Sequence, residues 1–108
     1  MSRGTLAITG ATGFVGQTLV RLALDGGWHV RALTRSPKPP TEGRIWINGS
    51  LEDPASLAEL VRGSDAVIHV AGIVNARYRA GFAKGNIEGT QAVVYAAKNE
   101  GIRRFIHV

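Results

Sequence analysis

Cysteine is absent from the 108 residues of this chain, which excludes a disulfide framework, a thiolate metal site and a cysteine nucleophile. No apolar run approaches the roughly 18 residues that a membrane-spanning helix needs, and the N-terminus lacks the layout of a signal peptide. The three histidines, His29, His69 and His107, do not have the spacing of metal ligands. We therefore expect a cytoplasmic protein with no membrane segment and no metal site.

The composition is that of a folded globular protein, because 44% of the residues are hydrophobic and only 19% are charged. A chain of this length can form one domain around a single core. The formal net charge of +5 raises the question of nucleic-acid binding. The basic residues are scattered, however, and no aromatic ladder interleaves with them. A solvated surface and an anionic ligand explain the charge more simply, so we expect no nucleic-acid partner.

Patterns typical of strands and of helices alternate along the chain. Strands are predicted over 5–9, 28–34, 44–48, 65–70 and 102–108, and helices over 14–24, 54–61 and 82–99. Gly26 and Gly27 would close the first helix, and Asp53 would cap the second. The proline-rich segment 36–43 replaces a crossover helix. This order predicts an α/β fold with a doubly wound, Rossmann-like parallel sheet of five strands in the order 3-2-1-4-5, truncated after the fifth.

The most informative stretch is the turn between the first strand and the first helix, Thr9-Gly10-Ala11-Thr12-Gly13-Phe14-Val15-Gly16. Such a turn presents backbone N–H groups and the positive end of a helix to a phosphate. Gly10 would permit a tight exit from the strand, Gly13 a close approach of a pyrophosphate, and Gly16 the packing of the helix. Phe14 and Val15 would contribute backbone N–H groups, while their side chains pack, with Val15 facing the sheet. The motif in this context indicates a dinucleotide-binding site.

Four stretches together make the chain resemble the extended and atypical short-chain dehydrogenase/reductase superfamily, which includes nucleotide-sugar epimerases, dehydratases and related reductases. They are the glycine turn, Gly49-Ser50-Leu51-Glu52-Asp53, Val67-Ile68-His69-Val70-Ala71-Gly72 and Asn86-Ile87-Glu88-Gly89-Thr90. Their order and spacing are far more specific than any one of them. The resemblance covers only the first half to third of a typical member. It implies that residues 1–108 are an NAD(P)-binding domain, the N-terminal part of a larger enzyme whose substrate subdomain is absent.

The resemblance implies cofactor contacts after the second and third strands. Arg35 stands where an NAD-preferring site has Asp or Glu, and a guanidinium there can clamp a 2′-phosphate or stack on adenine. Ser36 could add a hydroxyl donor and Lys38 could add charge, so NADP is favoured over NAD. The alternative is that Arg35 is a solvated loop residue. Ser50 replaces the Asp that contacts the adenine amino group in many members, and Leu51 would pack on the adenine face.

Two further segments are implicated by the same resemblance. Ala71 and Gly72 would lie beneath the ribose and phosphate, where small residues let the backbone approach the ligand. Asn86 would lie near the nicotinamide, with simple support of the helix against the sheet as the alternative. His69 is predicted to be a hydrogen-bonded core residue rather than a catalytic one, because no partner base or nucleophile is visible near it in the sequence.

No catalytic residue is predicted within the chain. The resemblance implies a Ser or Thr and a Tyr-x-x-x-Lys pair beyond Val108, and Tyr95 and Lys98 have the wrong spacing to replace that pair. The expected function is the NAD(P)-binding portion of an oxidoreductase or nucleotide-sugar epimerase/dehydratase with a small-molecule substrate. The alternative is a non-catalytic NADP-binding sensor or accessory subunit. Because apolar residues of the 102–108 strand would form an edge, self-association through this strand or the long helix is also predicted.

Overall fold

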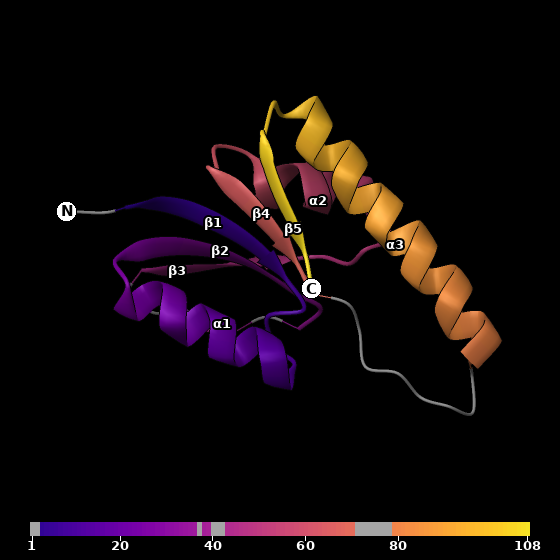
Figure 1. Cartoon of the computed structure of the whole chain (residues 1–108), viewed down its shortest axis with the longest axis horizontal. Coiled ribbons are helices and arrows are strands. Elements are labelled where there is room, and N and C mark those ends of the chain that lie inside the picture. The colour runs from indigo at the N-terminus through magenta and orange to yellow at the C-terminus, as the bar shows by residue number, and fades with distance from the viewer. Residues whose placement is uncertain (1–2, 37, 40–42, 71–78) are drawn as a thin grey trace.

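The computed structural model describes residues 3–36, 38–39, 43–70 and 79–108, and over 79–86 it describes the backbone alone. Strands and helices follow one another as β1 (Gly4–Thr9), α1 (Phe14–Asp25), β2 (Trp28–Thr34), β3 (Arg44–Asn48), α2 (Pro54–Val61), β4 (Ala66–His69), α3 (Arg79–Asn99) and β5 (Arg104–His107) (Figure 1). The bounds predicted for β2, β3 and α2 are confirmed. The long helix begins at Arg79 rather than at residue 82, and β5 is shorter than the strand predicted at 102–108.

The described strands form one sheet in the order β3-β2-β1-β4-β5, with every neighbouring pair parallel. β1 lies at the centre, where Ile8 pairs with Ala32 of β2 and Ile68 of β4. This confirms the predicted doubly wound order. The chain builds the sheet outward from β1 in one direction and then in the other, so a crevice is expected at the carboxyl ends of β1 and β4.

The helices cover both faces of the sheet, with α1 on one side and α2 and α3 on the other (Figure 1). Alternate residues of β1 divide between the two cores, because successive side chains of a strand point to opposite faces. Leu6 and Ile8 pack on the α1 side with Val20 and Val30, and Ala7 packs on the other side. The α2 and α3 side buries Leu33, Ile47, Leu57, Leu60, Val61, Val67, Val93, Ala96 and Ala97. The central strands are thus packed against buried side chains on both faces of the sheet.

Gly26 and Gly27 close α1 as predicted, whereas the start of α2 differs from the prediction. Gly26 closes α1 with φ −82°, and the left-handed residue is Gly27 with φ +91°. Asp53 occupies the N-cap position of α2, but its side chain makes no capping hydrogen bond. The hydroxyl of Ser56 instead donates to the carbonyl of Asp53 at 2.8 Å, so a side chain inside the helix closes this turn. The predicted capping role of the Asp53 carboxylate is wrong.

No helix in the described parts of the chain combines the length and the apolar character that crossing a bilayer requires.

Candidate functional site

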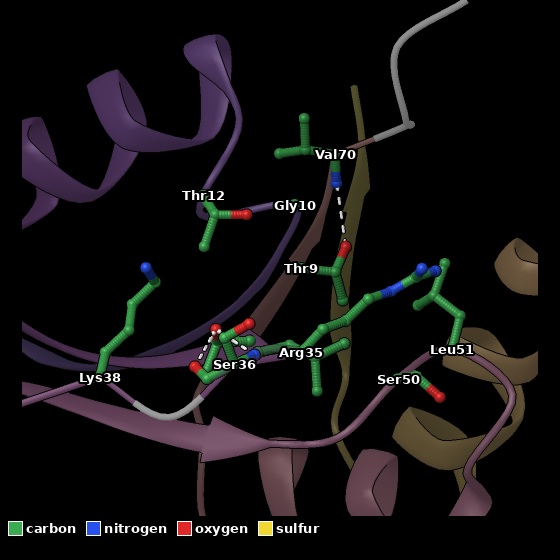
Figure 2. A pocket seen from close by; sticks show the side chains of 11 residues that line it. Thr9, Gly10, Thr12, Arg35, Ser36, Lys38, Ser50, Leu51 and Val70 are labelled. Carbon is green, nitrogen blue, oxygen red and sulfur yellow. Dashed lines mark hydrogen bonds between the residues drawn. The ribbon is translucent and has the colours of Figure 1, made fainter.

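A cavity of about 290 Å³ opens at the carboxyl ends of the strands (Figure 2). The ends of β1 and β2 and the segments after β1, β2, β3 and β4 line it with Thr9, Gly10, Thr12, Leu33, Thr34, Arg35, Ser36, Lys38, Ser50, Leu51 and Val70. The cavity therefore lies at the crevice that the strand order predicts. None of these lining residues is acidic, and two are basic. The described wall of the cavity favours an anionic ligand.

The glycines of the turn between β1 and α1 meet different demands. Gly10 has a left-handed φ of +68°, and a Cβ there would lie 2.8 Å from the carbonyl oxygen of Val70. A Cβ on Gly16 would overlap the carbonyl oxygen of Gly10 and lie 2.8 Å from the Cα of Ala11. A Cβ on Gly13 would meet only the Gly10 oxygen, at an ordinary 3.5 Å. The protein's own packing thus requires Gly10 and Gly16, whereas at Gly13 it leaves space free.

The start of α1 is well suited to an anion. The N–H groups in the first turn of a helix have no acceptor within the helix, and the helix dipole is positive there. No acidic residue lies in the first turn of α1 to compete for these groups. Gln17 donates from its side chain to the carbonyl of Thr12 at 2.8 Å, which steadies the turn. A pyrophosphate fits this donor set and the free space at Gly13.

The side chains of Phe14 and Val15 do not pack as predicted. Phe14 is 86% exposed and Val15 is 47% exposed, so Val15 does not face the sheet. The residues of α1 that are buried are Gly16, Val20 and Ala23. Close contact between Gly16 and the Gly10 backbone sets the rotation of the helix, and this rotation turns the two preceding side chains outward.

Arg35 and Ser36 follow β2 at the cavity wall. Both are exposed, and the Arg35 side chain extends toward Leu51 in Figure 2. The buried hydroxyl of Thr34 donates to the carbonyl of Ser36 at 2.7 Å and accepts from the Ser36 N–H at 3.2 Å. Thr34 therefore holds the segment that carries Arg35. Sequence reasoning missed this role, although threonine two residues before a bend is a known turn-forming pattern.

Ser50 and Leu51 are held in place from two sides. The N–H of Ser50 donates to the hydroxyl of Ser56, and that hydroxyl reaches the Ser50 carbonyl, both at 3.3 Å. A Cβ on Gly89 of α3 would lie 2.9 Å from the Leu51 side chain, so Leu51 packs closely against this helix. The segment after β3 is thereby fixed between α2 and α3.

His69 is a fully buried residue of β4, as predicted, and both of its ring nitrogens have partners. Nδ1 lies 2.6 Å from the hydroxyl of Thr9, and Nε2 lies 3.1 Å from the hydroxyl of Thr90 on α3. The Thr9 hydroxyl also accepts the N–H of Val70 at 3.2 Å. Burial lowers the pKa of His69 below its usual 6.5, and the stacked ring of His107, with centroids 5.2 Å apart, lowers it further. The network joins β1, β4 and α3 beside the cavity.

The cavity brings together many of the predicted site residues. Gly10, Thr12, Arg35, Ser36, Ser50 and Leu51 line it, Ala11 is buried beneath the turn, and Gly13, Phe14, Val15 and Gly16 form the start of α1 beside it. Ala71 and Gly72 lie outside the described residues, and Asn86 lies in α3 with its side chain not described. Thr9, Leu33 and Thr34 also line the cavity and were missed, because strand-end residues look like ordinary core in the sequence. Val70 lines it as well and directly precedes the predicted Ala71 and Gly72. Across the described ranges, no group of three His, Asp or Glu side chains could hold a metal ion.

Comparison with known proteins identifies the class to which this arrangement belongs. The sequence profile of the NAD dependent epimerase/dehydratase family matches residues 6–108, so the chain belongs to this family. The predicted resemblance to the short-chain dehydrogenase/reductase superfamily is thereby confirmed, and the dinucleotide class NAD(P) with it.

Individual relatives agree with this assignment. Ceramide reductase of Caulobacter vibrioides is 40% identical over 94% of this chain and 33% of its own length. A short-chain dehydrogenase/reductase superfamily protein from Agrobacterium tumefaciens, solved with bound NAD, is 30% identical with a TM-score of 0.77, over 95% of this chain and 31% of that one. The negative transcriptional regulator NmrA, solved with NADP, has a TM-score of 0.79 over 99% of this chain and 33% of that one. At 23% identity it shows the fold alone. The chain spans about a third of the length of each of these proteins.

Proposed function

We propose that residues 1–108 form the N-terminal cofactor-binding part of a reductase, dehydrogenase or epimerase, and that the cavity after β1, β2 and β3 takes NADP in preference to NAD. The observation that carries the proposal is the glycine turn, in which space is left free only at Gly13, next to the start of α1. Family membership supports the dinucleotide, and the basic wall of the cavity supports the phosphorylated form. When bound, the cofactor supplies the hydride chemistry, and the protein supplies binding and orientation.

The pyrophosphate would be held by backbone groups. The N–H groups of Phe14, Val15 and Gly16 are the free donors of the first turn of α1, and the helix dipole favours a negative charge in front of them. Gly13 would let the phosphate approach the backbone closely, since a side chain there would occupy the ligand's space. Side chains of this turn would contribute little, so recognition of the pyrophosphate depends on the backbone conformation.

The adenosine end would be bound by the segments after β2 and β3. A site that prefers NAD usually offers a carboxylate to the ribose hydroxyls, and the described cavity wall has none. Arg35, Ser36 and Lys38 would instead surround a 2′-phosphate, with the guanidinium making charge-assisted hydrogen bonds. Leu51, which packs against α3, would contact the adenine face, and the Ser50 hydroxyl would accept from its amino group.

The nicotinamide end of the proposed site involves Ala71 and Gly72, which lie outside the described part of the structure, and Asn86, whose side chain lies outside it too. Ala71 and Gly72 would lie beneath the ribose and phosphate, and Asn86 would lie beside the nicotinamide, by resemblance to the family. The ceramide reductase and the dehydrogenase/reductase structure support a small carbonyl or hydroxyl compound as the substrate of the whole protein. Self-association through β5 or α3 also stays a prediction.

Titration with NADPH and with NADH tests the cofactor proposal. We expect NADPH to bind more tightly, and Arg35→Ala to weaken NADPH binding by about tenfold or more while leaving NADH unchanged, because hydrogen bonds to charged groups contribute roughly 1.5–3 kcal/mol. Arg104→Ala on β5, at the opposite edge of the sheet, removes the same charge and is the matched control. Equal affinity for the two cofactors would refute the preference alone. Binding of neither would refute the site in this chain.

A different assay distinguishes the oxidoreductase proposal from the alternative, a non-catalytic NADP-binding sensor. A protein that includes the segments following Val108 should transfer hydride between the bound cofactor and a carbonyl compound if the oxidoreductase proposal is right. Tight NADPH binding without any turnover on a panel of ketones, aldehydes and nucleotide sugars would favour the sensor.

A further inference from the structure

A second cavity, of about 540 Å³, lies beside the first and shares Thr12 and Lys38 with it. Its other walls come mainly from α1, which contributes Arg21, and from β3, which contributes Arg44 and Trp46. Trp46 packs against the core on the α1 side of the sheet. We call this cavity the β3 groove. A ligand in the first cavity could therefore extend past Thr12 and Lys38 into the β3 groove.

The β3 groove carries three basic side chains, Arg21, Lys38 and Arg44, and none of its described lining residues is acidic. Two of these cations lie against one indole. The Nζ of Lys38 is 5.8 Å from the ring centroid of Trp46, and the Cζ of Arg44 is 5.4 Å from it. Cation–π attraction orients both groups but leaves their mutual repulsion unrelieved. The ion pair found among the described residues, Arg62 with Glu100, does not involve them.

Arg44 also has an unpaired donor. Its Nε is buried and has no hydrogen-bond partner, and it is the one buried side-chain nitrogen or oxygen in the described residues of which this is true. Buried polar atoms in proteins are almost always paired, and no described protein atom accepts a hydrogen bond from this N–H at the wall of the basic groove. The fork of guanidinium donors matches the oxygens of a phosphate.

We propose that the β3 groove binds a phosphate monoester, with Arg44 and Lys38 as its principal ligands and Arg21 adding charge. The phosphate has two sources, the 2′-phosphate of NADP or a separate phosphate-bearing compound. Where the source is NADP, the inference rests on the proposed function. It extends that function, because Arg44 on β3 would then bind the same 2′-phosphate as Arg35 after β2. In Figure 2 the Lys38 side chain extends toward Thr12, whereas Arg35 extends toward Leu51, so the two cations approach the cavity from different sides.

Arg44→Met tests the groove, because methionine keeps a long apolar side chain against Trp46 and removes the charge and the donors. NADPH, NADH and inorganic phosphate are titrated separately into the purified protein, with phosphate replacing chloride at constant ionic strength. We expect Arg44→Met to weaken NADPH binding about tenfold, to leave NADH within about twofold, and to abolish competition between phosphate and NADPH. Arg44→Lys should restore part of the effect. Arg104→Met, which lowers the net charge equally at the far edge of the sheet, should change nothing.

The outcomes separate the two sources and the two proposals. Loss of phosphate binding in Arg44→Met with an unchanged ratio of NADPH to NADH affinity would assign the groove to a separate phosphate compound. Phosphate binding that depends on Arg44 in a protein that binds neither dinucleotide would uphold the groove and refute the cofactor site. Unchanged affinity for both NADPH and phosphate would overturn the groove while leaving the cofactor proposal intact. Should Arg44→Met fail to fold by circular dichroism, Lys38→Met, at an exposed loop position, gives the same readouts.

Discussion

Alanine at two glycines of the same turn should act on different properties of the protein. Gly16 faces the backbone of Gly10 and Ala11, and a Cβ there overlaps the Gly10 carbonyl oxygen. Neither backbone can move away easily, because Gly10 is already left-handed at φ +68° and lies against Val70. We therefore expect Gly16→Ala to cost about 3 kcal/mol, the upper part of the range for overpacking. For a domain of this size that lowers the melting temperature by roughly 10 °C or more.

Gly13→Ala should behave in the opposite way. Gly13 has φ −80° and ψ 176°, an extended conformation that alanine adopts without strain, and the added Cβ meets its nearest atom at 3.5 Å. The substitution should raise the free energy of unfolding by about 0.5 kcal/mol, because alanine restricts the unfolded chain. It should nevertheless weaken NADPH binding by about tenfold or more, because the methyl group occupies the space that a phosphate would enter.

Thermal unfolding and NADPH titration of the two variants and the wild type provide the assay. Gly63→Ala is a useful control for the glycine substitution itself, because Gly63 has φ +73° and no neighbour within 4 Å, so it reports backbone strain without a clash. The reasoning would be refuted if Gly13→Ala lost as much stability as Gly16→Ala. It would also be refuted if Gly13→Ala bound NADPH as tightly as the wild type.

Two further predictions concern pH and assembly. The pKa of His69 is lowered in the folded protein, whereas in the unfolded chain it stays at its usual value of about 6.5. As the pH drops from 7.5 toward 5, the unfolded chain therefore protonates His69 before the folded protein does, and the free energy of unfolding should fall. His107→Ala should reduce this fall by removing the neighbouring positive charge, and urea titrations that show no such difference would contradict the assignment. On β5, Ile106 is 52% exposed at the edge of the sheet, so the wild type should self-associate with rising concentration and Ile106→Lys should not. Sedimentation equilibrium decides this, and a monomeric wild type at high concentration would contradict it.

Local signals in the sequence were enough to predict the scaffold. Two glycines directly precede β2, the proline-rich segment separates β2 from β3, and Pro54 is the first residue of α2. The predicted bounds of these three elements therefore agree with the structure. The alternation of strands and helices then restricts the topology to the order that is found. The glycine turn was also predictable, because its residue types and its place between a strand and a helix occur together in the sequence.

The rest depends on contacts between distant residues. Val15 was expected to face the sheet, but the rotation of α1 follows from the approach of Gly16 to Gly10, which no helical periodicity reveals. Thr9 and His69 are sixty positions apart, and their hydrogen bond exists only because β1 and β4 are neighbours. The pairing of Arg44 and Lys38 over Trp46 likewise requires the segment after β2 to return beside β3. Sequence periodicity indicates whether a segment is a strand or a helix, but it does not show which side chains meet in the fold.

Gly10 and Gly16 serve the protein's own packing, whereas Arg35 and Lys38 are exposed and no described residue forms an ion pair with them. Substitutions at the first pair threaten folding, and substitutions at the second pair leave the core untouched. If Arg35 and Lys38 set the choice of dinucleotide as proposed, a lineage carrying this scaffold could change that choice by single substitutions whose products still fold. The capacity to bind a dinucleotide would then be inherited with the fold, while the choice between its two forms stays open to selection.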